Sequence, residues 1–338
     1  KLLLANATAD FGHAVRIVRG EILQPWTLVD YHAIPFLYQW THLLPLAVGS
    51  VVTVLGAAAL LHALRRGGPA NLVFVSWVLL YFLLIGGLLA KSVRYVLPMV
   101  PAISVLSAHL MVRIWSKRRA LGVLLMAVVL FPNAVLGIAF SRVYTDTDSR
   151  LQAARWIERN LPAGSAVGLE GGGFPLYRLL DDSPIEKIWL DLPQIFYTSP
   201  YLLCANRLDL LRRRLDKMDY LAIVDANRMA QYRAVPDLFP VVSEFYQRLI
   251  DEESGFTLAK RFKVNPGLFG LRFDDSGSEP SFLGYDHPAV LIYRLDAEQV
   301  KAAFATWRGE LSRDSSCADK LLLAAADDLK AGNYERAR

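Results

Sequence analysis

The residues best able to do chemistry lie in one short segment, Lys91-Ser-Val-Arg-Tyr-Val-Leu-Pro-Met-Val-Pro101. Two cations, Lys91 and Arg94, and the adjacent Tyr95 stand there between two long apolar runs. Ionisable side chains close to a hydrocarbon core are costly unless they are paired, so such residues usually have a function. An arginine can hold a phosphate with bidentate hydrogen bonds, and a lysine can add a point charge. The segment therefore predicts a phosphate site, and snorkelling toward lipid headgroups is the equally weighted alternative.

Other ionisable groups favour structural roles. The pair Asp286-His287 precedes a proline and an apolar run. Such a pair can do acid–base chemistry, but we expect it to stabilise a turn. We interpret His62 and His109 as interior histidines, because no spacing of His, Asp or Glu in the chain favours a metal site. Arg113 lies near the inner end of an apolar run and is predicted to snorkel.

A glycine-rich segment, Glu170–Phe174, follows a predicted strand. It lacks the glycine spacing and the Lys-Ser/Thr pair of nucleotide-binding loops, so we expect a flexible turn there. Arg212–Arg214 is predicted to be a solvated helix face. Cys204 and Cys317 could pair in an oxidising exterior, but they are far apart in sequence and we expect no bridge.

The elements that position these groups begin with four apolar runs. Each is about 20 residues long, which is the length that crosses a hydrocarbon core of roughly 30 Å. None shows the polar stripe that a helix of a soluble bundle would carry. We therefore predict a polytopic α-helical membrane region with transmembrane helices over residues 43–64, 70–90, 93–114 and 120–140.

The charge distribution divides the chain at the end of these runs. The 338 residues carry a net charge of +5, and 54% of them are hydrophobic while 20% are charged. Residues 1–145 hold 12 Lys/Arg and 3 Asp/Glu, and no acidic residue occurs from Tyr31 to Thr145. Residues 146–338 hold 25 Lys/Arg and 29 Asp/Glu. This composition excludes a disordered chain and a disulfide scaffold, and a basic half made of apolar runs argues against a nucleic-acid partner.

Basic residues also predict the orientation. Arg65, Arg66 and the run Lys117–Arg119 lie between predicted spans, and the positive-inside rule places both loops in the cytoplasm. Residues 1–42, the turn near Lys91 and everything after Phe140 would then lie outside. We thus expect a multi-pass protein of the plasma (inner) membrane with an extracytoplasmic C-terminal domain. An aromatic cluster before the first span fits a membrane-interface belt, or the edge of a substrate groove: Trp26, Tyr31, Tyr38 and Trp40.

Beyond residue 140 the pattern changes to alternating helix and strand, which predicts an extracytoplasmic α/β domain over residues 141–300 with a partly parallel sheet. Asp148 or Ser149 can cap its first helix. Residues 301–338 read as a helical tail whose end, 324–338, resembles the first half of a tetratricopeptide repeat. The expected helices run to about residue 160 and over 208–217, and the expected strands cover 166–169, 220–224, 256–262 and 290–295.

The segment that begins at Lys91 resembles the Lys-x-x-Arg-Tyr-x-x-Pro-x-x-Pro region of polytopic (GT-C type) glycosyltransferases that use polyprenyl-phosphate sugars. These include protein O-mannosyltransferase-like and aminoarabinose-transferase-like enzymes. Three further segments resemble the same family, and together the resemblance covers roughly residues 20–296: Tyr38-Gln-Trp-Thr-His42, Ala153-Ala-Arg-Trp-Ile-Glu-Arg-Asn-Leu-Pro162 and Tyr285-Asp-His-Pro-Ala-Val-Leu-Ile-Tyr293.

The resemblance implies sugar transfer from a lipid phosphate on the extracytoplasmic side. By this match Lys91 and Arg94 would hold the carrier phosphate and Tyr95 would shape the same pocket. The donor would be a polyprenyl-phosphate-linked sugar, with no metal or further cofactor implied. The family's catalytic carboxylate lies on its first outer loop, and no residue here matches it. We therefore expect the catalytic residue upstream and this portion to be inactive alone, and assign no role to Asp10, Glu21 or Asp30.

Two functions follow as expectations. The first is the C-terminal part of a membrane glycosyltransferase whose partners are the lipid-linked sugar, membrane lipids and an acceptor protein, lipid or glycan. The alternative is a non-catalytic, membrane-anchored protein whose outer α/β domain binds a glycan or another protein. A transporter is a weaker third option, because the spans show no ionisable relay and no paired broken helices.

Overall fold

The chain forms two compact units. The computed structural model describes residues 2–20, 27, 31–170, 174–190, 192, 204–224, 226–236 and 239–313. The helical unit comprises Lys1–Thr145 and Asn265–Asp286, and the sheet unit comprises Asp146–Val264 and His287–Arg338. The composition predicts a single boundary at residue 141 and does not anticipate that a later segment, Asn265–Asp286, belongs to the helical unit.

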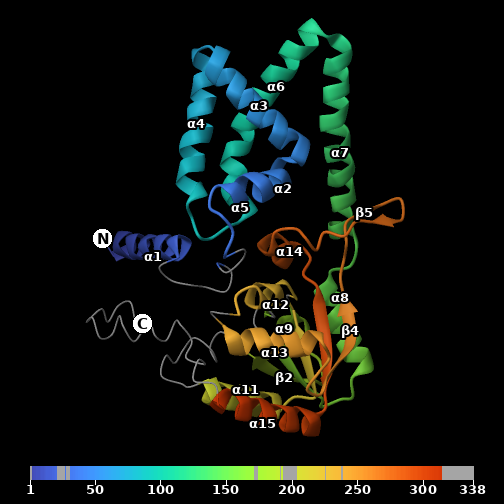
Figure 1. The fold of residues 1–338 in the computed structure, drawn as a ribbon. Helices are drawn as coiled ribbons and strands as arrows, with labels where there is room; N and C mark the ends of the chain where they lie inside the picture. Colours follow the sequence, from blue (N-terminus) through green and yellow to red (C-terminus); the bar gives the residue numbers. More distant parts are fainter. Residues whose placement is uncertain are drawn as a thin grey trace, which may run out of the picture. The chain divides into compact units, whose positions relative to one another are not determined.

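Long apolar helices make up most of the helical unit (Figure 1). Among the described residues, three helices are long and apolar enough to cross a membrane, and a bent pair of helices adds a fourth. α4 is Pro69–Gly86, and α7 is Arg119–Thr145. Between them α5 (Val93–Val96), the 3₁₀ turn η3 (Leu97–Met99) and α6 (Val100–Lys117) form one run. These elements cover the last three predicted spans.

The prediction of a single transmembrane helix over residues 43–64 is wrong. The π-helix η2 (Gln39–Leu43) and α2 (Leu44–Val48) form one piece, and α3 (Ser50–Arg66) leaves it at an angle of 115°. The break is at Gly49, whose φ of +87° disfavours any residue with a side chain. A Cβ at Gly49 would also lie 2.7 Å from Oδ1 of Asn133 on α7. The straight apolar helix therefore begins at Ser50.

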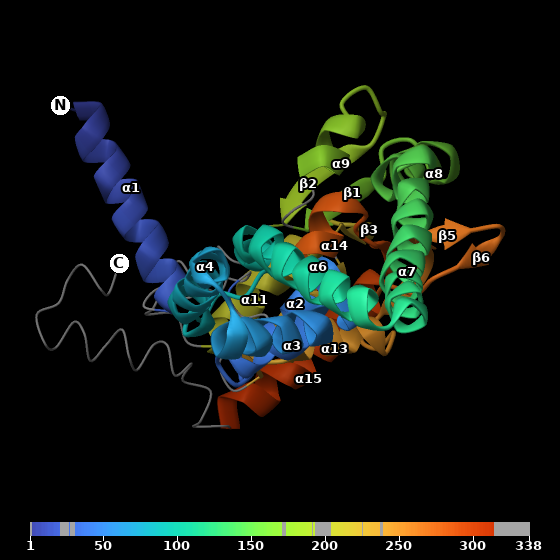
Figure 2. The ribbon, with the colours of Figure 1, turned by 90° about the horizontal axis from the view of Figure 1, so that it is seen from above.

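α6 is the centre of the helical unit and packs against α3, α4 and α7 (Figures 1 and 2). Gly56 on α3 allows a close approach, because a Cβ there would lie 2.6 Å from Cγ2 of Ile103. Small residues at contact points are how helices approach each other in a bilayer. Leu84 and Phe131 are each 72% exposed on the outside of this bundle, which is a favourable position in lipid and a costly one in water.

Two smaller parts complete the helical unit. α1 (Leu2–Arg19) ends where the carbonyl oxygen of Val18 accepts hydrogen bonds from the backbone N–H groups of Leu89 and Ala90, at 3.0 and 3.2 Å. The segment 265–286 forms a two-stranded hairpin and a short helix. These elements are β5 (Gly267–Leu268), β6 (Leu271–Arg272) and α14 (Pro280–Asp286).

The sheet unit holds a five-stranded sheet of order β2-β1-β3-β7-β4. β1 pairs in parallel with β2 and β3, whereas β7 is antiparallel to β3 and β4. The predicted α/β class with a partly parallel sheet is therefore confirmed. The strands are β1 (Ala166–Glu170), β2 (Glu186–Leu190), β3 (Tyr220–Ile223), β4 (Phe256–Phe262) and β7 (Val290–Leu295).

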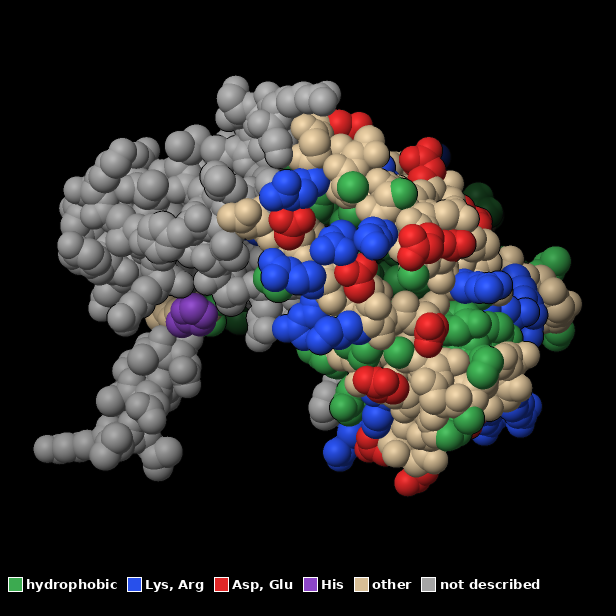
Figure 3. Space-filling model, turned by 90° about the horizontal axis from the view of Figure 1, so that it is seen from below, with side chains coloured by type: hydrophobic (Ala, Val, Ile, Leu, Met, Phe, Trp, Pro, Cys, Tyr) green, Lys and Arg blue, Asp and Glu red, His purple; other side chains and the backbone are tan. Residues whose placement is uncertain are grey.

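Helices cover this sheet, and the outer surface of these helices is exposed to solvent. α8 begins at a cap in which the Asp148 carboxylate accepts from the Arg150 N–H, and its Ile157 packs with Val167 and Ile292 in the core. Basic and acidic side chains are interspersed over α11 and α15, as on a soluble domain (Figure 3). The helices are α8 (Ser149–Asn160), α9 (Phe174–Leu179), α11 (Cys204–Leu215), α12 (Ala226–Arg233), α13 (Pro240–Ile250) and α15 (Ala297–Arg313).

Candidate functional site

The predicted phosphate site is a tight turn between α4 and α6, and we call residues Lys91–Tyr95 the cationic turn. Regular α-helix gives way to a 3₁₀ turn at Leu97–Met99, which contains Pro98, and Pro101 lies in the first turn of α6, where proline is tolerated. The carbonyl oxygen of Pro98 accepts a 2.8 Å hydrogen bond from Nε1 of Trp77 on α4. This hydrogen bond links the 3₁₀ turn to α4.

The two cations of this turn have different surroundings. Lys91 is 4% exposed, its amino group donates to the carbonyl oxygen of Leu89 at 3.2 Å, and it lies 5.7 Å from the ring centre of Tyr38. Arg94 is exposed, and its guanidinium carbon lies 5.5 Å from the ring centre of Tyr95. The structure therefore brings Arg94 and Tyr95 together and places Lys91 in the protein interior. Phosphate binding by these residues remains a prediction.

The carboxylate of Glu279, which the sequence did not indicate, accepts hydrogen bonds from the cationic turn. Glu279 is 3% exposed, and its Oε2 accepts hydrogen bonds from Ser92 Oγ at 3.4 Å and from the Val93 N–H at 3.5 Å. A carboxylate is buried only where charged or hydrogen-bonding groups compensate its lost hydration. No spacing or motif points to Glu279, because it is separated from Ser92 by 187 positions.

A polar cavity of about 410 Å³ lies beside the turn, and its wall includes Tyr38 and Glu279. The rings of Tyr38 and His42 stack with centres 4.7 Å apart. Tyr38 therefore lines a cavity, whereas Trp26 lies outside the described residues. The lining residues are Tyr38, Thr41, His42, Pro45, Leu46, Ser50, Gly277, Ser278 and Glu279.

Thr41 links two groups beside the cavity. Its hydroxyl oxygen lies 2.8 Å from the carbonyl oxygen of Leu37 and 2.8 Å from Nδ1 of His42. The tautomer of His42 decides which of the two groups donates in the second contact. A carboxylate, an imidazole and four hydroxyls thus line a space suited to a hydroxylated ligand.

The remaining candidate residues have different surroundings. Arg113 Nη1 lies 3.1 Å from Nε2 of His62, so Arg113 does not merely snorkel. His109 is exposed, so the prediction of an interior histidine is wrong there. Asp286 ends α14, while His287 is 3% exposed. No group of three or more His, Cys, Asp or Glu suited to a metal ion occurs in the described part of the chain.

Glu170, at the end of β1, belongs to a buried network. It is fully buried, Tyr246 donates a 3.1 Å hydrogen bond to its Oε1, and Arg228 Nη1 lies 3.7 Å from the same oxygen. Burial, followed by the nearby Glu170 charge, raises the pKa of Tyr246 well above its usual value. The glycines of the predicted turn, the side chain of Cys204, Cys317 and the tail beyond residue 313 lie outside the described residues.

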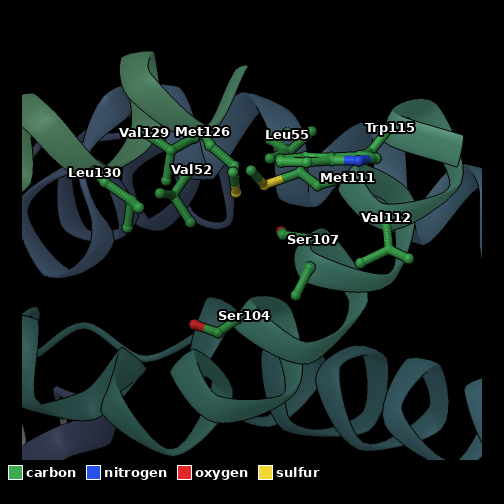
Figure 4. A pocket seen from close by; sticks show the side chains of 11 residues that line it. Val52, Leu55, Ser104, Ser107, Met111, Val112, Trp115, Met126, Val129 and Leu130 are labelled. Carbon is green, nitrogen blue, oxygen red and sulfur yellow. The ribbon is translucent and has the colours of Figure 1, made fainter. Parts of the chain in front are cut away.

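A second hollow, of about 300 Å³, lies among α3, α6 and α7 (Figure 4). Met111 and Met126 face it together with valines, leucines and Trp115, and its only polar side chains are Ser104 and Ser107. With no charged group in its wall, this hollow can receive hydrocarbon and offers no means of moving a proton or holding a phosphate. It is therefore not the candidate reaction site.

Comparison with known proteins adds no family to this description. No known family model matches the chain, and a search of curated proteins finds no match.

Proposed function

We propose that this chain is part of a membrane glycosyltransferase that moves a sugar from a polyprenyl-phosphate carrier to an extracytoplasmic protein, lipid or glycan. The observation that carries the proposal is the polar cavity of about 410 Å³, whose wall contains Glu279 and Tyr38 next to the cationic turn. A space lined by hydrogen-bonding groups thus adjoins a site of positive charge. This combination suits a ligand with a hydroxylated part and an anionic part.

The cationic turn supplies the charge that such a transfer requires. When the bond between sugar C1 and the phosphate oxygen breaks, the leaving phosphate gains negative charge, the acceptor oxygen bonds to C1, and the acceptor's hydroxyl proton passes to a base. Fixed cations at the leaving group stabilise that change. Arg94 is exposed and oriented by the Tyr95 ring, so its guanidinium is available for a bidentate contact. Lys91, held between Leu89 and Tyr38, contributes a fixed positive charge.

The cavity would hold the sugar. Its hydroxyl, imidazole and carboxylate groups can exchange hydrogen bonds with sugar hydroxyls, and the stacked Tyr38–His42 pair offers an aromatic wall. We assign no catalytic base. The carboxylate of Glu279 is engaged by Ser92 and Val93, and Asp10, Glu21 and Asp30 match no position of the family's motif.

Donor binding by two arginine variants tests the proposal. We expect Arg94→Ala to weaken binding of a polyprenyl-phosphate sugar in nanodiscs by about tenfold or more, since a charge-assisted hydrogen bond contributes about 1.5–3 kcal/mol. The matched control is Arg66→Ala, which removes an exposed arginine from the last turn of α3. Equal donor affinity in both variants would exclude Arg94 from the site. Donor binding without sugar transfer by the complete protein would favour the alternative, a non-catalytic membrane-anchored binding protein.

A further inference from the structure

The β5–β6 hairpin has an unusual residue in its turn. Gly267 pairs with Arg272 and Leu268 with Leu271, which leaves Phe269 and Gly270 as a two-residue loop. Both loop residues have positive φ, +50° and +84°. Such turns normally carry Asn-Gly or Asp-Gly, and a bulky side chain at positive φ is strained. Strain of this kind is typical of functional positions.

No contact in the described part of the chain buries the side chain of Phe269. Phe269 is 96% exposed, and Leu271 beside it is 67% exposed. Apolar side chains gathered at an exposed tip indicate a surface that another apolar phase covers.

The base of the hairpin is fixed to the last turns of α7. β5 contacts α7, and a Cβ on Gly267 would lie 3.2 Å from Cδ of Arg142. The apolar part of α7 ends just before Arg142, so this is where the helix would leave the hydrocarbon core. The hairpin projects from α7 on the side away from α3, α4 and α6 (Figures 1 and 2). In a bilayer, this side of α7 would face lipid.

We infer that the hairpin tip, residues 268–271, is a membrane anchor that inserts Phe269 and the adjacent leucines into the interface of the lipid bilayer. Phenylalanine and leucine favour the headgroup–acyl boundary. Arg142 and Arg272 stand at the base, where lipid phosphates are found. This inference needs only that α7 crosses a membrane and does not depend on the proposed sugar transfer.

A probe at the tip tests the insertion directly. In the complete chain with Cys204 and Cys317 replaced by alanine, Phe269→Cys is labelled with an environment-sensitive fluorophore and reconstituted into phosphatidylcholine–phosphatidylglycerol nanodiscs. We expect a blue-shifted emission that spin-labelled lipids quench. The control label at Lys301→Cys, on the exposed surface of α15, should emit as in water and remain unquenched. A tip label that behaves like the control would overturn the inference, and so would a shielded label that lipids do not quench.

A second measurement avoids the label. Phe269→Asn suits the positive-φ turn and should leave the fold intact, whereas Phe269→Trp keeps an interfacial aromatic. In nanodiscs, we expect amide hydrogen exchange over residues 267–272 to be at least tenfold faster in Phe269→Asn than in the wild-type protein. Exchange in Phe269→Trp should be close to that of the wild-type protein. Equal exchange in the wild-type, asparagine and tryptophan proteins would contradict insertion.

Discussion

At the level of single residues, the two buried carboxylates Glu279 and Glu170 differ in their surroundings. Glu279 holds the backbone of the cationic turn through Ser92 and Val93, and it also lines the polar cavity. Glu170 is engaged by Tyr246 in the core of the sheet unit. Both carboxylates are buried with partners, and Glu279 borders the polar cavity. The environment of the residue, rather than its type, therefore identifies Glu279 as part of the candidate site.

Removal of Glu279 should loosen the cationic turn. We expect Glu279→Ala to lower the free energy of unfolding by about 1–3 kcal/mol, because it removes the hydrogen bonds that the carboxylate accepts from Ser92 and Val93. Thermal unfolding of the detergent-solubilised protein measures this change. Glu158→Ala, an exposed residue of α8, is the control and should change stability by less than about 0.5 kcal/mol. A loss no larger than that of the control would contradict the supporting role of Glu279.

Tyr293 should make the sheet unit sensitive to alkali. Burial, followed by the Glu252 charge, raises its pKa to about 12. A pKa that is higher in the folded state means that the contribution is fully present below about pH 10, the pKa in the unfolded chain, and is lost as the pH rises toward 12. We expect a loss of about 2–3 kcal/mol over this range. Denaturant unfolding at several pH values measures this loss. Between pH 10 and pH 12 the free energy of unfolding should fall less for Tyr293→Phe than for the wild-type protein. An equal fall in both proteins would exclude Tyr293 as the cause.

At the scale of elements, the break between α2 and α3 decides where the cavity lies. Gly49 turns the chain so that η2 and α2 leave the direction of α3, which places Tyr38, Thr41 and His42 in the cavity wall. A single straight helix over residues 43–64 would carry these side chains in another direction. The cavity thus depends on one backbone conformation that glycine adopts readily.

Substitution of Gly49 should therefore damage the helical unit. We expect Gly49→Ala to destabilise the protein by about 1–3 kcal/mol, since it adds backbone strain at φ +87° and a clash 2.7 Å from Asn133 Oδ1. The matched control is Gly137→Ala on α7, where a Cβ meets nothing within 4 Å and better helix propensity should leave stability unchanged or higher. Thermal unfolding of both variants in detergent makes the comparison. Equal stability of the two variants would contradict the account of the break.

For the whole molecule, charge predicts the side of the membrane on which each part lies. The described helices are long and apolar enough to span a bilayer, and basic residues flank two of the turns between them. The positive-inside rule then assigns Arg65, Arg66 and Lys117–Arg119 to the cytoplasm. Orientation is a prediction from composition, and it needs a test that reports sidedness.

Labelling of single cysteines measures that sidedness. We expect a membrane-impermeant thiol reagent to label Lys301→Cys in cells whose outer barrier is opened, and Gly68→Cys only after the membrane is permeabilised. Both positions are exposed, so access and not burial decides the result. A denatured sample of each variant controls for thiol reactivity. Labelling of Gly68→Cys in sealed cells would reverse the predicted orientation.

Local sequence pattern is enough to predict several elements. Apolar runs predicted α4, α6 and α7, and the strands predicted over residues 256–262 and 290–295 have the bounds of β4 and β7. The break at Gly49, the cavity and the place of Glu279 become visible in the folded chain alone. A turn at positive φ, a carboxylate bound 187 positions away and a hairpin fixed to α7 all arise from long-range contacts. Periodicity records which face of an element is apolar, but it carries no information about which distant segment covers that face.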